Sequence, residues 1–286
     1  SLKIDYRLAL VGAVAFSFSS YFFIIIQAGH MTKAHAIAYL PMVVAAVLYT
    51  YRGKIILGGV LTSLAVAMQI YANHLQITYY LLLLLLLVGI VQFIKDFKAN
   101  NLLDFLKRTV VLILAAILAT GTSFTRLATT MEYGQESTRG KSELTTDLEN
   151  KTSGLDKDYA TSWSYGIAES FTLFIPNFYG GASQGALNTD SETYKAIKRA
   201  PNAKQIIKRL PLYWGGQPFT SGPVYVGAVV MFLFVFGLLF VKSEMRIWIL
   251  LATILSIMLA WGKNFMPLTN LFLEYFPGYS KFRAVS

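Results

Sequence analysis

Histidine and lysine alternate in one short polar stretch, residues 29–35, which reads Gly-His-Met-Thr-Lys-Ala-His. The ammonium of Lys33 can act as a point charge on a phosphate, and the imidazoles of His30 and His35 can donate hydrogen bonds to it. These residue types at this spacing predict a phosphate or diphosphate site. The alternative is an interfacial loop whose polar side chains are only hydrated.

The third histidine, His74, lies in a second polar turn, residues 73–76, which reads Asn-His-Leu-Gln. A turn favours asparagine and other polar residues without any ligand. The argument for a binding role is therefore spatial, because we expect this turn to lie near residues 29–35.

Aromatic residues and glycine are concentrated in two patches, residues 160–181 and 213–222. Sugar rings commonly bind on aromatic faces beside a carboxylate, because the C–H face stacks and the hydroxyls need acceptors. The predicted sugar- and acceptor-binding side chains are Trp163, Tyr165, Trp214 and Gln217. Turn and aromatic-belt structure is the alternative for both patches. Glu169 is the candidate general base, with Asp156 and Asp158 as competitors and a lysine ion pair as its structural alternative.

Metal chemistry has little support in the sequence. The chain has no cysteine, which excludes disulfides and Cys-based metal sites. No carboxylate lies at helical spacing from any histidine, so zinc is not predicted. No cofactor is evident, and a divalent cation is compatible with the residues without being supported by a ligand cluster.

Most of the remaining chain is apolar. Of the 286 residues, 55% are hydrophobic and 14% are charged, and the mean hydropathy is +0.51. A soluble domain has roughly a quarter of its residues charged, so we interpret the protein as an integral membrane protein. The runs of spanning length are residues 8–27, 36–51, 54–72, 77–94, 108–124, 224–241 and 246–261. The net charge of +10 is not a nucleic-acid footprint, because most bases flank these runs.

Lysine and arginine in the short loops fall at alternate ends of the seven runs, which sets the orientation by the positive-inside rule. The sequence thus predicts an all-α polytopic membrane protein with about seven transmembrane helices. The outer side then holds all three histidines and residues 126–222, a polar segment with ten Asp/Glu and eleven Lys/Arg. Acids on the cytoplasmic side, such as Asp96 and Asp104, are interpreted as ordinary interface charge. Lys281 and Arg283 lie on the outer side, against the general trend, and are candidates for an anionic lipid or phosphate.

We therefore expect three parts in the chain. Residues 1–125 form transmembrane helices one to five, and residues 126–222 form an extracytoplasmic cap of mixed structure between spans five and six. Residues 223–286 form the last two spans and an outer interfacial segment. The predicted location is the bacterial inner (cytoplasmic) membrane, with the cap on the extracytoplasmic side.

Five segments in this order resemble the YfhO family of bacterial polytopic membrane proteins, in its Bacteroidetes-type form. They are residues 29–36, 161–169, 175–181, 213–227 and 277–283, the last reading Pro-Gly-Tyr-Ser-Lys-Phe-Arg. The resemblance covers nearly the whole chain. It implies similarity to the GT-C glycosyltransferases, multi-span enzymes that transfer a sugar from a polyprenyl-phosphate donor on the outer side of the membrane.

The resemblance implies a cell-envelope glycan or lipid as the acceptor, membrane lipids as partners, and no nucleic acid. GT-C enzymes typically carry a catalytic Asp in the first outer loop, but residues 29–35 contain no acid. We therefore expect the catalytic carboxylate to lie outside these 286 residues, in a longer protein.

Two alternatives stay open. A transporter or flippase of a lipid-linked envelope precursor predicts ionisable residues deep within spans and paired broken helices, but the apolar runs contain few such signals. A non-catalytic envelope assembly protein is the third interpretation.

Overall fold

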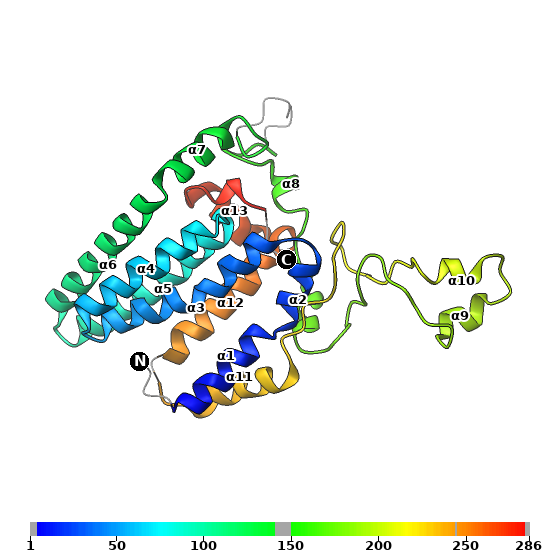
Figure 1. Ribbon diagram of the computed structural model, residues 1–286, viewed down its shortest axis with the longest axis horizontal. Coiled ribbons are helices and arrows are strands. Elements are labelled where there is room, and N and C mark those ends of the chain that lie inside the picture. The colour runs from blue at the N-terminus through cyan, green and yellow to red at the C-terminus, as the bar shows by residue number, and fades with distance from the viewer. Residues whose placement is uncertain (1–4, 141–149, 244, 284–286) are drawn as a thin grey trace. The chain divides into compact units, whose positions relative to one another are not determined.

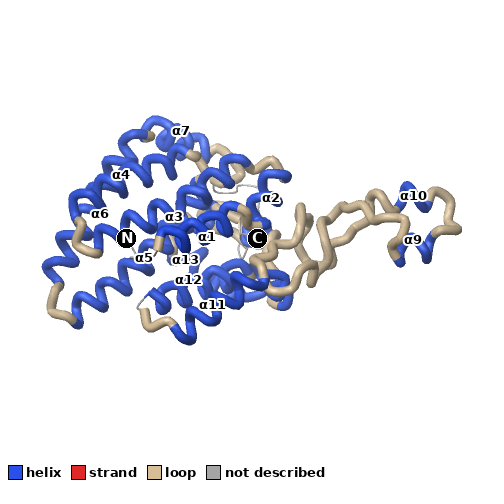
Figure 2. The backbone as a smooth tube through the Cα atoms, turned by 60° about the horizontal axis from the view of Figure 1, so that its bottom comes forward, coloured by secondary structure: helices blue, strands red, loops and turns tan. Residues whose placement is uncertain are grey.

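The computed structural model describes residues 5–140, 150–243 and 245–283 (Figure 1). Within these ranges every regular element is a helix, which confirms the predicted all-α class. Figure 2 shows the described backbone as helices joined by loops. The described part of residues 126–222 contains short helices and two isolated β-bridges, Gly180 with Tyr213 and Gly185 with Leu210, and no strand lies among these described residues. Glycine and proline in these segments interrupt any longer ladder.

All seven predicted apolar runs are helical, but fewer of them meet the length and composition of a membrane span. Three helical segments do so: Tyr6–Gln27, which contains α1 (Tyr6–Ser17) and α2 (Ser20–Gln27), Met31–Tyr51 and Leu75–Lys98. A fourth is added if Met245–Ala260 and Gly262–Tyr275, which are bent by 113° relative to each other, count as one broken span. These apolar helices indicate a membrane protein.

The chain divides into two compact units, and the first comprises the described residues of 1–18, 29–139 and 242–254. Its centre is a group of four helices, α3 (Met31–Tyr51), α4 (Ile55–Tyr71), α5 (Leu75–Lys98) and α6 (Leu102–Thr122), followed by α7 (Phe124–Gln135). Their buried contacts include Val43, Val47, Ala65 and Leu81. α4 runs close to α3, because Gly58 leaves no room for a Cβ against the backbone of Thr50.

The turns between these helices follow from the residue types. Gly53, Asn73 and Asn100 have positive φ values of 92°, 55° and 56°. Glycine and asparagine adopt this left-handed conformation at the lowest cost, and it ends a helix within one or two residues. Short links of this kind make consecutive helices neighbours.

The second unit comprises residues 19–28, the described residues of 140–241, and residues 255–283. Its helices are α2, α8 (Lys157–Ala160), η1 (Ala168–Leu173), α9 (Glu192–Ile197), α10 (Ala203–Ile206), α11 (Ala228–Phe240), the end of α12 (Met245–Ala260), η2 (Gly262–Phe265), α13 (Met266–Tyr275) and η3 (Tyr279–Lys281). The units therefore cut the chain differently from the three predicted ranges, since α7 belongs to the first unit and residues 19–28 to the second.

Candidate functional site

The first aromatic patch is fixed to the place where α12 breaks. The chain turns there at Gly262, which has a φ of +44°. The backbone N–H of Tyr165 donates to the carbonyl of Ala260 at 2.7 Å, and the side-chain amide of Asn264 donates to the carbonyl of Tyr165 at 2.7 Å. A helix end leaves backbone groups without intrahelical partners, and here the patch supplies them.

Two side chains strengthen this attachment. The hydroxyl of Ser164, which is 1% exposed, accepts from the N–H of Lys263 at 2.8 Å and donates to the carbonyl of Thr161 at 2.6 Å. The indole N–H of Trp261 donates to the hydroxyl of Ser170 at 2.8 Å. These hydrogen bonds hold residues 161–170 at Ser164 and at Ser170. They thereby fix the backbone that carries Trp163 and Tyr165, the two predicted sugar-binding residues.

Glu169 joins the two predicted patches to each other. Its carboxylate is buried, and Oε1 accepts from the hydroxyl of Tyr213 at 2.7 Å and from Nε2 of Gln217 at 3.3 Å. Oε2 accepts from the N–H of Gly166 at 3.0 Å. A buried carboxylate needs such donors to offset the loss of hydration. In this geometry Glu169 holds residues 166–169 against residues 213–217.

The tyrosines around this carboxylate keep their protons at neutral pH. Burial, together with the hydrogen bond to Glu169, raises the pKa of Tyr213 above its ordinary value. Burial and the nearby charge of Glu169 raise the pKa of Tyr165 to about 12. Tyr213 was missed in the sequence reasoning, although it opens the second patch directly before Trp214. The position of Tyr213 before a tryptophan in a glycine-rich turn does not indicate that its hydroxyl donates to Glu169.

In a second cluster, Arg283, a predicted phosphate-binding residue, stacks on Trp163, a predicted sugar-binding residue. The guanidinium carbon of Arg283 lies 4.5 Å from the ring centroid of Trp163 and 5.6 Å from that of Tyr159. The ring of Phe219 meets Trp163 edge to face at 5.3 Å. Cation–π stacking uses the face of the guanidinium, while its N–H donors lie in the plane and suit phosphate oxygens. Trp214, the other predicted sugar-binding tryptophan, is 78% exposed.

In the first unit, three predicted residues share one electrostatic environment. His74 caps α5, and its Nδ1 accepts from the N–H of Ile77 at 3.3 Å. Burial lowers the pKa of His74 to about 4, with further lowering by the charges of Lys33, His30 and Arg139. His74 is therefore neutral at pH 7 among basic neighbours. Arg139 was not singled out in the sequence, since it lies about 65 residues beyond His74 in a polar segment.

His35 lies outside this arrangement. It is exposed on α3, two positions after Lys33. Side chains two residues apart on a helix do not face each other. The sequence grouped His30, Lys33 and His35 as one predicted phosphate site. In the structure His30 and Lys33 act on His74, whereas His35 is not among the charges that affect it.

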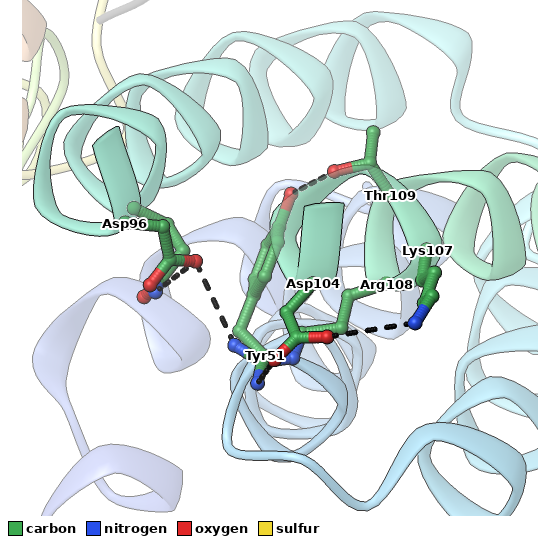
Figure 3. A network of polar contacts seen from close by, with 7 residues as sticks. Tyr51, Asp96, Asp104, Lys107, Arg108 and Thr109 are labelled. Carbon is green, nitrogen blue, oxygen red and sulfur yellow. Dashed lines mark hydrogen bonds and ion pairs between the residues drawn. The ribbon is translucent and has the colours of Figure 1, made fainter. Parts of the chain in front are cut away.

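Another polar network lies at the C-terminal end of α5 (Figure 3). Asp96 is 5% exposed and lies 3.6 Å from Arg108, while Asp104 lies 3.9 Å from the same guanidinium. Tyr51 shares a 3.3 Å hydrogen bond with Thr109. Asp96 is thus a buried ion-pair partner that links α5 to α6, whereas the sequence suggested ordinary interface charge. The sequence did not indicate this role, because the ion pair joins residues on two different helices.

Among the residues that the structure describes, no group of three or more His, Asp or Glu side chains is placed to hold a metal ion.

Comparison of the chain with protein-family models, with curated proteins and with solved structures finds no match.

Proposed function

We propose that this protein is a membrane glycosyltransferase of the GT-C type, related to the YfhO family, that uses a polyprenyl-phosphate-linked sugar to modify a cell-envelope acceptor. The observation that carries the proposal is the stacking of Arg283 on Trp163. A polyprenyl-phosphate sugar needs a cation for its phosphate and an aromatic face for its sugar ring. These two groups lie side by side in the second unit, on segments 120 residues apart in the chain.

The surrounding contacts support a preorganised site. Trp163 stands on residues 161–170, which are tied to the α12 break through Ser164 and Tyr165. Glu169 ties the same segment to Tyr213 and Gln217. A binding surface held in this way loses little conformational entropy when a ligand arrives.

In the proposed reaction an acceptor hydroxyl attacks the anomeric carbon, the bond from that carbon to the phosphate oxygen breaks, and a base takes the hydroxyl proton. Arg283 would stabilise the charge that develops on the departing phosphate. Trp163 would orient the sugar ring. Glu169 is a poor candidate for the base in this conformation, because both carboxylate oxygens are buried and already accept hydrogen bonds. No base is assigned within the described residues.

The basic group of His30, Lys33, His74 and Arg139 in the first unit is a separate candidate for an anionic lipid headgroup. Neutral His74 keeps its second ring nitrogen as a donor, because Nδ1 already accepts from Ile77. The charges of Lys33 and Arg139 favour an anion there.

The proposal includes the topology of seven spans in the bacterial inner membrane, with residues 126–222 on the extracytoplasmic side. Besides the three helical segments of spanning length, it requires four more helices to cross. These are α6, α12 and the shorter apolar helices Ile55–Tyr71 and Ala228–Phe240. A helix of 17 residues is near the lower limit for crossing a bilayer. The shorter α11 would need local thinning of the bilayer or help from its flanking residues.

The test is transfer of a labelled sugar from its polyprenyl-phosphate donor to envelope material by membranes that contain the protein. Arg283→Gln should lower transfer at least about a hundredfold if the guanidinium stabilises the leaving phosphate. Arg283→Lys should recover part of it, since the charge remains but the planar fork is lost. Trp163→Ala should raise the donor KM more than Trp163→Phe. Lys242→Gln, an exposed site after α11, is the matched control. Unchanged transfer in Arg283→Gln and Trp163→Ala would overturn the proposal.

A flippase for a lipid-linked precursor is the second candidate, and the 113° bend between Met245–Ala260 and Gly262–Tyr275 is the observation that favours it. Broken helices commonly form the substrate sites of transporters. Proteoliposomes with a fluorescent lipid-linked sugar separate the two functions. Movement of the label to the other leaflet without formation of a new glycosidic bond would favour the flippase.

A further inference from the structure

Residues 126–222 contain nearly equal numbers of acids and bases, but the two kinds of residue are distributed differently along the segment. Eight of the ten acids precede residue 170, whereas residues 190–209 contain two acids and six bases. The acids in that stretch are Asp190 and Glu192, and the bases are Lys195, Lys198, Arg199, Lys204, Lys208 and Arg209. All six bases are exposed. We call residues 190–209 the basic tip.

The basic tip is carried on a paired arm of the second unit. Gly185 and Leu210 exchange two backbone hydrogen bonds, at 3.0 and 2.9 Å, and Gly181 donates to the carbonyl of Leu212 at 2.8 Å. Nearer the tip, Leu187 donates to the carbonyl of Ile207 at 2.8 Å. Figures 1 and 2 show α9 and α10 standing clear of the other elements of the second unit. The tip therefore presents its charges to its surroundings.

The tip is also a small folded unit. Asn202, with a φ of +63°, turns the chain between α9 and α10. Ala203 and Ile207 are 6% and 3% exposed and form its apolar interior. The charges are consequently on the outer surface of an ordered element. Glu192 pairs with Lys195 at 2.6 Å. The other five bases of the tip follow at residues 198–209, a stretch that contains no acid.

The surface chemistry of the tip distinguishes between anionic partners. Within residues 188–209, all of which the structure describes, Ile206 is the one large apolar side chain that is exposed, at 43%. Membrane-surface helices insert a broad apolar face, and single-stranded nucleic acids stack on exposed aromatic rings. The tip has neither feature. The tip offers six exposed cations on a projecting support, and several cations of this kind can bind a flexible polymer that carries repeated anions.

We propose that the basic tip binds a linear anionic polysaccharide through the carboxylate or phosphate groups along that polymer. This interaction surface goes beyond the proposed sugar transfer and does not depend on it, because no residue of the tip belongs to the Trp163 or Glu169 clusters. Binding is electrostatic, so it weakens as salt rises.

The experiment uses the whole chain in neutral phosphatidylcholine nanodiscs and measures binding of two fluorescent polysaccharides, polygalacturonate and phosphorylated dextran. The test variant is Lys198→Gln/Lys204→Gln/Lys208→Gln. The matched control, Lys198→Arg/Lys204→Arg/Lys208→Arg, keeps the charges and changes the same three positions. Each lost exposed ion pair weakens binding by a factor of about two, so the glutamine variant should bind about tenfold more weakly while the arginine variant binds like the original. Asp190→Asn should bind more tightly.

Preference for one polymer over the other identifies carboxylate or phosphate as the recognised group. Equal binding by the glutamine and arginine variants would overturn the proposal, as would the absence of binding to both polymers at low salt. A third probe is vesicles of phosphatidylcholine and phosphatidylglycerol in equal parts. If the glutamine variant loses binding to these vesicles while its polymer binding is unchanged, the tip is a membrane contact and the proposal is wrong.

Discussion

Replacing Glu169 by glutamine keeps the size and shape of the side chain but turns one acceptor oxygen into an NH₂ donor. Both oxygens of Glu169 now accept from buried or half-buried donors: Tyr213 and Gln217 on Oε1, and the N–H of Gly166 on Oε2. If the glutamine oxygen takes the place of Oε1, its NH₂ group opposes the N–H of Gly166. If the amide is reversed, the hydroxyl of Tyr213 loses its acceptor.

Either orientation leaves a buried donor without a partner, which costs about 1–3 kcal/mol. The remaining hydrogen bonds also lose the charge that strengthens them. We therefore expect Glu169→Gln to lower the free energy of unfolding by about 2–4 kcal/mol. Tyr213→Phe removes one donor and leaves the carboxylate with its other two, so it should cost about 1–2 kcal/mol.

Reversible unfolding in mixed micelles, driven by increasing mole fraction of a denaturing detergent, measures these differences. The double variant completes a cycle, in which residues in direct contact should show a coupling of about 0.5–3 kcal/mol. The proposed sugar transfer is measured in parallel. Additive effects of the two substitutions would refute the network. So would a Glu169→Gln protein that unfolds like the original but has lost transfer entirely, because Glu169 would then act as a base rather than hold two segments together.

Three further predictions concern the first unit. Gly58→Ala places a Cβ 2.8 Å from backbone atoms of α3 and should cost about 1–3 kcal/mol of stability, whereas Gly121→Ala, with open space around it, should change detergent unfolding by less than about 0.5 kcal/mol. Asp96→Asn removes the closer carboxylate from Arg108 and should cost about 1–3 kcal/mol in the same assay; an unchanged midpoint would contradict this role. Because the pKa of His74 is lowered to about 4, the unfolded chain binds a proton more readily below its ordinary pKa of 6.5. Stability should therefore fall by about 1 kcal/mol between pH 6.5 and pH 4, after allowance for solvent screening, and His74→Gln should remove that part of the pH dependence.

The helices were predictable from the sequence, and the reason is local. An apolar run of sufficient length satisfies its own backbone in an apolar surrounding only as a helix. The turns at Asn73 and Asn100 follow from residue type as well. The number of helices with the length and composition of a span did not follow, because a run such as residues 224–241 gives only a 13-residue helix, Ala228–Phe240. The helix starts late because Gly227, with a φ of +105°, precedes it.

The candidate site was predictable in its residue types but not in its pairings. Trp163 and Arg283 were singled out for different reasons, and nothing in either local sequence indicates that one stacks on the other. Tyr213 was missed for the same reason, since its importance comes from a carboxylate 44 residues earlier. His35 was grouped with Lys33 by proximity in sequence, yet the helix that contains both separates them by its own geometry. Pairings of this kind depend on tertiary contacts that a single sequence does not contain.

The break after α12 limits which part of the protein can move. A broken helix exposes a carbonyl and an N–H, and each costs several kcal/mol in an apolar surrounding unless another group satisfies it. Tyr165 satisfies the carbonyl of Ala260, and Ser164 satisfies the N–H of Lys263. Movement of residues 161–170 away from the break would leave both groups unpaired. Trp163 therefore belongs to a rigid surface, and any opening that admits the proposed lipid-linked substrate must come from other segments of the chain.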